Sequence, residues 1–385
     1  MFQNPKETAG KKNIKKVVVG YDLGRDNAQI SYCGLEESEP ETVSAVAGGE
    51  QYNIPMVLCK RIGVGQWYYG KEALKFAGEG NGILIEDILT LAERGEDVLV
   101  DGEAYDPAAL LTLFVKRSLS LLNIRVSLSQ IEAFMFTVEE LTPRMVDVLG
   151  KVSAGLQLRD ARVSFQSHLE SFYAYTLHQG KELWMNDVLI FEYTDLLRVL
   201  HFSCNRNTSP KVVFIEEVKY PEMTRRVWRD EPEVKEQQRT ELDLMFLHLA
   251  GECLEGKTVS SIYLLGDGFK EDWARESLKF LCKNRRVFQG NNLYSKGACY
   301  GIGERIKPGK EWKEYVYLGA DKLKSNIGMK ALRLGEDSYY AIMDAGNNWY
   351  ETSAEFDIIL ESGNTVEFVI TPLTGENVSS RLITL

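Results

Sequence analysis

The first candidate for a functional side chain is a carboxylate, Asp22, at the end of an apolar run. Asp22 follows the β-branched and apolar residues 17–21, and Gly24 stands two positions later. The backbone amides of a tight turn can bind phosphate oxygens, and a carboxylate beside them can hold Mg²⁺. The same pattern is also typical of an ordinary β-turn, in which the Asp side chain accepts hydrogen bonds from backbone amides.

Two glycines mark a second candidate site. Gly266 and Gly268 flank Asp267 directly after the apolar run 261–265. Glycine has no Cβ, so its backbone can come close to a ligand. The alternative is a strand-to-helix turn that requires a positive φ.

The composition limits the class of protein. With 385 residues the chain exceeds one typical domain, so two or three packed units are expected. The hydrophobic (44%) and charged (26%) fractions exclude a disordered or fibrous chain. The net charge of −11 argues against a nucleic-acid partner bound through its phosphates. The six cysteines lack any C-x-x-C pair and the four histidines stand alone, which predicts buried free thiols, structural histidines and no zinc site.

Two segments of the chain resemble a membrane span or a signal peptide and bear on where in the cell the protein is expected. Residues 108–122 are apolar at helical spacing but contain Lys116 and Arg117, so a buried helix is expected rather than a membrane span. Near the start, a basic segment precedes only a short apolar run and lacks the apolar core of a signal peptide. Its basic residues are Lys11, Lys12, Lys15 and Lys16. We therefore expect a cytoplasmic protein without a membrane partner.

The predicted strands and helices that would position these residues occur in the same order twice along the chain. Hairpin strands come first, and a helix, a strand and a further helix come after them. In the first round the strands are 14–21, 28–33, 42–47, 131–138 and 163–165, and the helices are 106–122, 142–156 and 169–177. In the second round the strands are 188–193, 199–203, 211–218 and 261–265, and the helices are 240–254, 273–283 and 293–302. The repetition predicts a duplicated α/β lobe with a cleft between the copies.

The C-terminal part changes character after a linker at 307–310. Five strands separated by Gly, Asn and Asp turns are expected at 315–318, 328–333, 339–344, 355–360 and 365–371. The predicted domains are therefore residues 14–183, residues 184–306 and a small antiparallel β domain at 315–385.

In this order, the elements resemble the nucleotide-binding domain of the actin, hexokinase and heat-shock chaperone ATPase superfamily. The closest likeness is to a divergent, reduced seventy-kilodalton heat-shock chaperone. The residues that carry it are 17–24, 54–55, 69–73, 136–138, Leu156, 170–175, 264–269 and 296–301. The resemblance implies a two-lobe actin-like (ribonuclease H-like) fold, and the tail resembles part of a chaperone's substrate-binding sandwich.

The resemblance also implies a site for ATP or ADP with Mg²⁺. Asp22 would be the metal ligand, and Glu170 would orient water as the catalytic carboxylate; a surface or capping role is the alternative for Glu170. The residues that would contact the nucleotide are Asp22, Gly24, Arg25, Gly266, Asp267 and Gly268.

Several catalytic parts of the family pattern are missing. Arg25 and Asp26 stand where the family has hydroxyl residues, residues 191–195 contain no glycine, and residues 84–89 contain no lysine. Arg25 either replaces the lysine, since guanidinium pairs with phosphate, or occludes the phosphate pocket. Without several preorganised donors, phosphoryl transfer should be slow.

The sequence therefore predicts a heat-shock chaperone-like protein with a weak or inactive ATP site that acts mainly by binding protein or peptide partners through its β-rich tail. An active ATPase or a kinase of the same superfamily is the alternative, and a polymerising actin relative is a third.

Overall fold

The computed structural model describes residues 16–46, 49–156, 158, 161–333, 335–360, 362–375 and 377–385. Residues up to 171 together with 294–306 form one compact unit, and residues 172–293 with 307–385 form a second. Each unit is considered by itself. Five residues named above lie outside the described ranges: Lys11, Lys12 and Lys15 of the basic segment, and Ile14 and Ala47 at the ends of predicted strands.

The first unit is built on a six-stranded sheet with the order β11-β10-β1-β2-β3, and β4 pairs with β2. Its strands are β1 (Val17–Leu23), β2 (Asn27–Gly34), β3 (Glu41–Thr42), β4 (Ile54–Pro55), β10 (Ile131–Val138) and β11 (Arg162–Ser167). The strand β2 runs antiparallel to β1, whereas β10 and β11 run parallel to it. Every residue of β1 is buried, as expected for a strand in the middle of a covered sheet.

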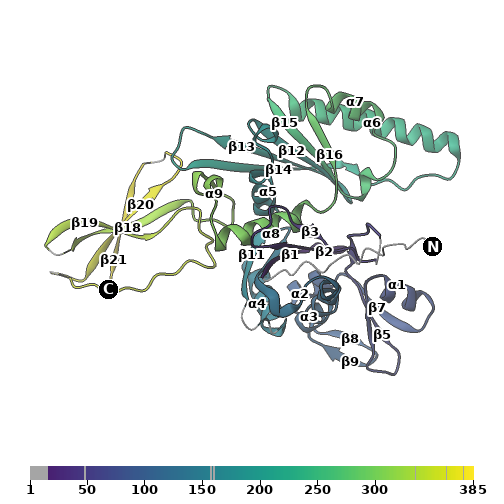
Figure 1. The fold of residues 1–385 in the computed structure, drawn as a ribbon, viewed down its shortest axis with the longest axis horizontal. Helices are drawn as coiled ribbons and strands as arrows, with labels where there is room; N and C mark the ends of the chain where they lie inside the picture. The colour runs from purple at the N-terminus through teal and green to yellow at the C-terminus, as the bar shows by residue number, and fades with distance from the viewer. Residues whose placement is uncertain are drawn as a thin grey trace, which may run out of the picture. The chain divides into compact units, whose positions relative to one another are not determined.

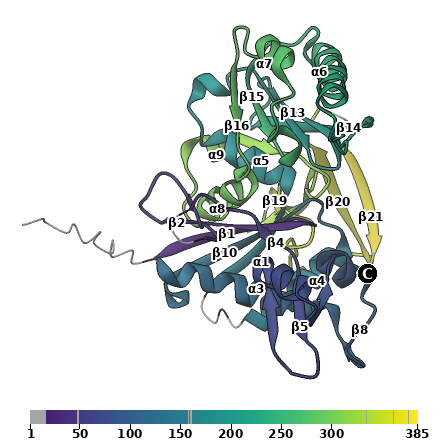
Figure 2. The same ribbon diagram turned by 90° about the vertical axis from the view of Figure 1, so that its right-hand side faces the viewer.

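Helices cover both faces of this sheet, with α3 and α4 on one side and α8 on the other (Figure 2). These helices are α3 (Pro107–Ser118), α4 (Pro143–Leu156) and α8 (Leu293–Ile306). Asp106 caps α3 by accepting the amide of Ala108 at 3.1 Å. The helix α8 packs closely on its neighbour, because a Cβ on Gly297 would lie 2.0 Å from the Ser171 carbonyl oxygen.

The rest of the first unit consists of short elements. They are β5 (Leu58–Arg61), β6 (Trp67–Tyr69), α1 (Gly70–Gly78), β7 (Gly82–Ile85), α2 (Ile88–Arg94), β8 (Val98–Val100) and β9 (Glu103–Tyr105). The strands β6, β5 and β7 form a three-stranded sheet, and β8 pairs with β9.

The second unit repeats the strand order. Its larger sheet has the order β16-β15-β12-β13-β14-β17, with an antiparallel meander β12-β13-β14 and with β15 and β16 parallel to β12. Its strands are β12 (Asp187–Tyr193), β13 (Leu196–Asn205), β14 (Lys211–Thr224), β15 (Val259–Leu265), β16 (Arg286–Gln289) and β17 (Tyr315–Tyr317). The strand expected at 315–318 thus extends this sheet by pairing with β14 instead of joining the tail.

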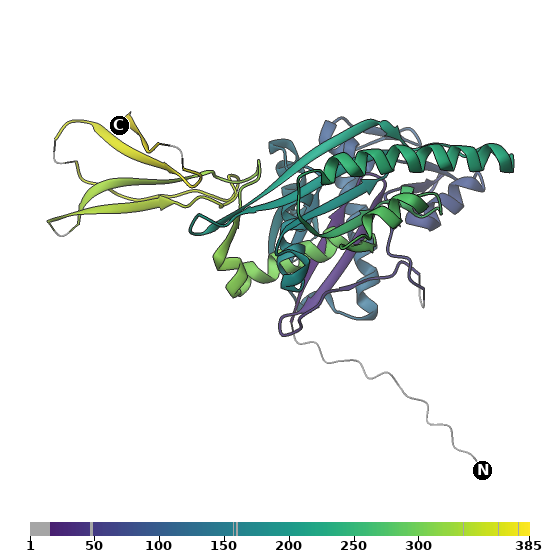
Figure 3. The same ribbon diagram turned by 90° about the horizontal axis from the view of Figure 1, so that it is seen from above.

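The helices of the second unit are led by α6. They are α6 (Pro232–Leu254), α7 (Arg275–Leu281) and α9 (Lys310–Glu314), while α5 (His168–Leu177) begins in the first unit and ends in the second. The second halves of α6 and α7 pack on the sheet through a core that includes Phe191, Phe246 and Leu281 (Figure 1). The helix α6 begins eight residues before the predicted position, and its first ten residues, 232–241, contain no buried side chain. Figure 3 shows these turns projecting past the strands of their own sheet.

The C-terminal part forms a four-stranded antiparallel sheet with the order β19-β18-β20-β21. Its strands are β18 (Ser325–Arg333), β19 (Glu336–Met343), β20 (Thr365–Pro372) and β21 (Ser379–Thr384). The strand predicted at 355–360 is wrong, because those residues, all of them described, contain no strand, and β21 was not predicted. The chain is therefore a mixed α/β protein with an antiparallel sheet at its C-terminal end.

Two further expectations concern burial. Pro107–Ile124 is the one described helical stretch that is long and apolar enough to span a membrane by length and composition, and half of it is buried within the structure. This burial matches the core helix expected there. All six cysteines are free; four are buried, but Cys204 is half-buried and Cys282 is exposed.

Candidate functional site

Asp22 occupies the penultimate position of β1, where its carboxylate is held by a histidine of the same unit. The Oδ1 atom of Asp22 lies 2.7 Å from Nε2 of His168, and the two residues are only 7% and 6% exposed. Because β1, β10 and β11 are parallel, their carboxyl ends lie at one edge of the sheet, and His168 follows directly after β11. The predicted metal ligand therefore already has a hydrogen-bond donor.

A tyrosine fixes the imidazole in place. The ring of Tyr294, in α8, stacks on His168 with centroids 4.0 Å apart and planes only 6° from parallel. Tyr294 is also buried, at 5% exposure. The ring of His168 therefore cannot leave Asp22 without disrupting the packing of α8.

Gln29, on the neighbouring strand β2, is a further polar residue beside Asp22. The two residues are opposite each other in the β1–β2 ladder, and Nε2 of Gln29 donates to Oδ1 of Asn53 at 2.5 Å. In the described part of the chain, neither Oε1 of Gln29 nor Nδ1 of His168 has a hydrogen-bond partner, although both atoms are buried. Buried polar atoms are normally hydrogen-bonded, so each is expected to bind an ordered water.

The turn after Asp22 uses its own amide. The backbone N–H of Gly24 donates to the carbonyl oxygen of Asn27 at 3.0 Å and so closes the β1–β2 turn. The side chain of Arg25 is 71% exposed, and its Nε lies 3.7 Å from Oε2 of Glu139. The Gly24 amide is thus already hydrogen-bonded and the Arg25 guanidinium is exposed, so neither group is positioned to bind a phosphate.

Glu170 lies in the first turn of α5 and is buried, at 3% exposure. Its Oε1 is 3.5 Å from Nη2 of Arg305 in α8, and its backbone amide donates to Oγ of Ser167 at 3.2 Å. A surface position for Glu170 is excluded by this burial. A carboxylate in the first turn of a helix is also stabilised by the helix dipole.

The glycine pair at the end of β15 packs against a tyrosine. Gly266 has a φ of 93°, and a Cβ there would lie 2.4 Å from the Tyr193 carbonyl oxygen. A Cβ on Gly268 would lie 2.4 Å from Cδ1 of the same Tyr193. Asp267 pairs with Lys270 at 2.7 Å, and the Trp273 indole donates to the Gly268 carbonyl at 2.7 Å. The packing of the protein itself accounts for both glycines, as the turn alternative expects.

The second sheet carries a carboxylate at the position that corresponds to Asp22. Glu192 is the penultimate residue of β12 and faces Arg198 across the β12–β13 ladder, as Asp22 faces Gln29. Nε of Arg198 donates to Glu192 at 2.8 Å, and its Nη1 lies 3.5 Å from Oε1 of Glu217. Arg198 is only 7% exposed. Thus both corresponding carboxylates are paired with a buried basic or imidazole side chain.

The described side chains around Asp22 do not by themselves form a cluster of metal ligands. Across the residues that the structure describes, no group of three or more His, Cys, Asp or Glu side chains could hold a metal. Mg²⁺ prefers oxygen ligands, whereas the partner of Asp22 is an imidazole nitrogen.

Sequence reasoning missed the partners of these carboxylates, which are His168, Arg305 and Arg198, and the ring of Tyr294 that stacks on His168. It treated His168 as an isolated, structural histidine, whereas the structure places it against Asp22 and Tyr294. The repeated strand order could have indicated the His168–Asp22 contact. Parallel strands place the residue that follows β11, which is His168, near the end of β1, where Asp22 stands.

The fold and the site define a mixed α/β protein with two sheets of the same strand order, each with a paired carboxylate near the end of its first strand, buried at Asp22 and half-buried at Glu192. Residues 39–320, well over half of the chain, match a family of unknown function (DUF5716, C-terminal), and the chain belongs to this family. Residues 322–385 match a domain of unknown function (DUF8552). The two matches meet between β17 and β18. No curated protein matches the chain.

Proposed function

We propose that this chain is a cytoplasmic, heat-shock chaperone-like binding protein with a two-lobe actin-like (ribonuclease H-like) fold and a weak or inactive nucleotide site. It acts by binding an extended segment of a partner protein at the C-terminal sheet. The strand order shared by the two larger sheets supports the fold, because the superfamily resemblance implies a duplicated α/β lobe.

The side chains near the strand ends support the loss of nucleotide affinity. Asp22 is engaged by His168, Glu192 is engaged by Arg198, and the amide of Gly24 is used within its own turn. Catalysis of phosphoryl transfer depends on donors that are already aimed at the phosphates. An active ATPase or kinase would need these groups to exchange their partners before nucleotide could bind.

The exposed edge strand β21 is the observation that carries the partner-binding role. All six residues of β21 are exposed, including Leu382 at 73% and Ile383 at 49%. Among the described residues it pairs with β20 alone, and it contains no proline and a single charged residue, Arg381. An edge with one charge and no proline or bulge can accept an extended chain by strand addition.

The opposite edge is better protected. Strand β19 begins with Glu336 and Asp337, and its ladder with β18 has an irregularity at Ile327 and Gly328. Charged residues and bulges hinder the addition of another strand. The partner should therefore join β21 rather than β19.

One face of the sheet indicates the chemistry of the partner. Met329 lies opposite Tyr340 on one side and Phe368 on the other, and Val366 lies opposite Ile383. Of the described apolar side chains in these four strands, only Met329 and Val366 are buried. A partner strand with alternating apolar residues would extend this apolar face and cover part of it.

The test uses the direction of the backbone groups in β21. The amide of Leu385 donates to Asn364 at 2.8 Å, so by antiparallel alternation Ile383 is bonded to β20 while the N–H of Leu382 points to the open edge. The substitution Leu382→Pro removes that outward N–H and spares the β20 ladder. Its matched control, Leu382→Thr, keeps the N–H and favours a strand.

Binding is measured by fluorescence anisotropy with reduced, carboxymethylated α-lactalbumin as a permanently unfolded client. The wild-type chain and Leu382→Thr should bind with affinities within about threefold, whereas Leu382→Pro should lose at least about tenfold, the equivalent of 1.4 kcal/mol. Equal binding by all three proteins would remove the β21 edge from the proposal. No binding by any of them would contradict the chaperone-like role.

A further inference from the structure

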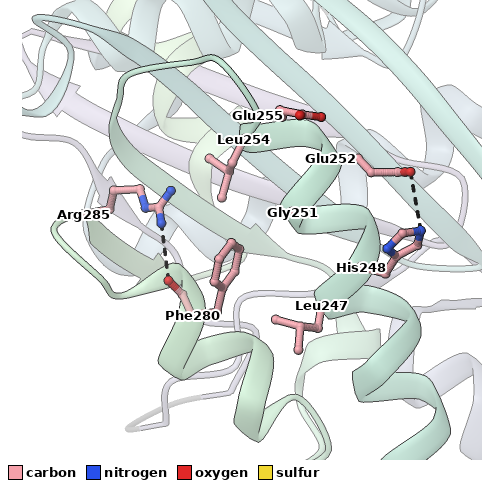
Figure 4. Close-up of a pocket in the computed structure, with 8 residues that line it drawn as sticks. All are labelled: Leu247, His248, Gly251, Glu252, Leu254, Glu255, Phe280 and Arg285. Atoms are coloured by element: carbon pink, nitrogen blue, oxygen red, sulfur yellow. Dashed lines mark hydrogen bonds and ion pairs between the residues drawn. The ribbon is translucent and has the colours of Figure 1, made fainter.

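A hollow on the second unit, between α6 and the segment after α7, is accounted for by the fold itself (Figure 4). Leu254 belongs to the core of the unit, and Phe280 packs against that core. Three polar groups around the hollow have partners within the unit. Nε2 of His248 lies 3.4 Å from Oε1 of Glu252, and Arg285 donates to backbone carbonyl oxygens at the end of α7. The packing of the unit therefore explains this hollow without a ligand.

The open edge of the C-terminal sheet, in contrast, carries a charge that the sheet does not use. Arg381 is the single charged residue of β21, and it is exposed. Within the described part of the chain, its guanidinium makes no ion pair, hydrogen bond or aromatic contact. A guanidinium presents a rigid fork of N–H donors that matches the two oxygens of a carboxylate. Arg381 is therefore suited to recognise a carboxylate on a partner.

Arg381 stands among apolar side chains on one face of the sheet. Residues directly opposite each other in a ladder lie on the same face, and so do residues two apart along a strand. Arg381 is opposite Phe368 in the ladder with β20. Ile383, two residues further along β21, is opposite the buried Val366. On this face, a strand added to β21 would therefore meet one cation with apolar neighbours.

The acidic residues of the sheet lie away from Arg381. In the four strands they are Glu336, Asp337 and Glu367. Glu367 lies opposite Leu382 and therefore on the other face, while the other two belong to β19 at the opposite edge of the sheet. A basic side chain across from Arg381 would be repelled, whereas a carboxylate there would pair with it. The edge is thus able to discriminate between partners by charge.

Strand addition would bring a partner side chain close to Arg381. The N–H of Leu382 points to the open edge, so Leu382 would form a hydrogen-bonded pair with an added antiparallel strand. Arg381 and Ile383 would then stand in non-hydrogen-bonded pairs, in which the side chains of the two strands lie closest. An antiparallel partner fits because the whole sheet is antiparallel. Such a partner would pass Ile383 first and Arg381 two residues later.

We propose that the β21 edge selects partner segments with the pattern apolar-x-acidic, read from the N- to the C-terminus. The apolar residue of the partner covers Ile383, and its aspartate or glutamate pairs with the guanidinium of Arg381. This inference rests on the proposed function, to which it adds the chemistry of the partner. A second copy of this chain fits poorly at the edge, because its β21 has no acidic residue to meet Arg381.

The test uses three fluorescein-labelled nonapeptides that differ at one position. Each has valines two and four residues before that position and serine or threonine elsewhere, and the variable residue is glutamate, glutamine or lysine. Fluorescence anisotropy should show that the wild-type chain binds the glutamate peptide at least about threefold more tightly than the lysine peptide, with the glutamine peptide between them. Raising the salt from about 0.05 M to about 0.5 M should reduce this preference, because salt screens an exposed ion pair.

Two matched variants locate the preference at Arg381. Arg381→Glu should reverse the order of the peptides, so that the lysine peptide binds most tightly. Its control, Lys330→Glu, makes the same change of charge at an exposed residue of β18. Lys330 lies on the other face of the sheet, because its neighbour Met329 is opposite Phe368. Lys330→Glu should therefore keep the order of the wild type.

The proposed selectivity is overturned if the wild type binds the three peptides equally or binds none of them. It is also overturned if Arg381→Glu still prefers the glutamate peptide, or if Lys330→Glu reverses the order as well, since the net charge of the chain would then be the cause. Self-association of the wild type in sedimentation that Leu382→Pro abolishes would overturn it too, because a second copy would then occupy the edge.

A failure of the proposed function is recognised separately. If Leu382→Pro binds the unfolded client and the glutamate peptide like the wild type, strand addition at β21 is wrong. If Leu382→Pro loses both while the wild type shows no preference among the peptides, only the selectivity is wrong.

Discussion

Nε2 of His168 lies 2.7 Å from Oδ1 of Asp22, and this contact joins the first residue of α5 to the end of β1 inside the first unit. The carboxylate can only accept, so the proton of the bond sits on Nε2. A buried carboxylate is costly unless it is paired and hydrogen-bonded. His168 therefore stabilises the negative charge of Asp22, the residue that the resemblance implies as a metal ligand.

Removing that histidine should destabilise the first unit. His168→Ala leaves the Asp22 carboxylate buried without its donor and also removes the ring that stacks on Tyr294. Loss of one partner of a buried pair typically costs about 3–5 kcal/mol. Urea unfolding followed by circular dichroism should show a loss of at least about 2 kcal/mol.

The matched variant is Asp22→Asn, which keeps an oxygen acceptor for Nε2–H and should cost less than His168→Ala. A double mutant with both changes should be no less stable than His168→Ala alone, because the unpaired charge is gone. If His168→Ala unfolds within about 0.5 kcal/mol of the wild type, the contact does not stabilise the unit.

Hydrolysis of ATP should stay near the uncatalysed background. The amide of Gly24 and the carboxylates of Asp22 and Glu192 are all engaged within the protein, so little remains to stabilise a transferring phosphoryl group. Phosphate release with Mg²⁺ and millimolar ATP is the measurement. Typical enzymes turn over at about 1–1000 per second. A rate in that range that is lost in Glu170→Gln would restore the alternative of an active ATPase.

Local signals in the sequence were sufficient for most elements of the two larger sheets. The predicted helix 106–122 begins at the cap of α3, Asp106, and the apolar run 261–265 predicted β15, since capping and strand patterns are properties of neighbouring residues. Residues 355–360 were expected to form a strand but form none; they lie in the connection between β19 and β20, the two strands that flank β18. Strand pairing depends on distant residues, which one sequence does not reveal.

The same limit applies to the candidate site. The sequence identified Asp22 and Glu170 as carboxylates in special settings, but their partners His168 and Arg305 are 146 and 135 residues away. A contact over that distance is fixed by the strand order and by the packing of α8. Local reasoning could therefore find the acids and not the side chains that hold them.

The pair Glu192–Arg198 should be structural and replaceable. Arg198→Ala should destabilise the second unit by about 3 kcal/mol or more, because Glu192 would be left partly buried without its partner. The double replacement Glu192→Leu with Arg198→Met exchanges the pair for apolar side chains, and such exchanges are often neutral or stabilising. Urea unfolding of the two variants makes the comparison. A double variant as unstable as Arg198→Ala would point to a further role for the pair, for example with Glu217.

The thiols should differ widely in their reactivity toward iodoacetamide. Burial raises the pKa of Cys33 to about 11 and raises the pKa of Cys299 well above its usual value. The thiolate is the nucleophile, and with a pKa of about 11 only about one Cys33 thiol in a thousand is ionised at pH 8. The exposed Cys282 should therefore be alkylated first in the folded protein.

Because burial raises the pKa of Cys33, its labelling should increase about tenfold per pH unit between pH 8 and 10 while the fold persists. Mass spectrometry of peptides after timed alkylation gives the rate at each cysteine. Labelling of Cys33 at pH 8 as fast as that of Cys282 would mean that β2 opens readily, in conflict with its place beside β1 in the middle of the first sheet.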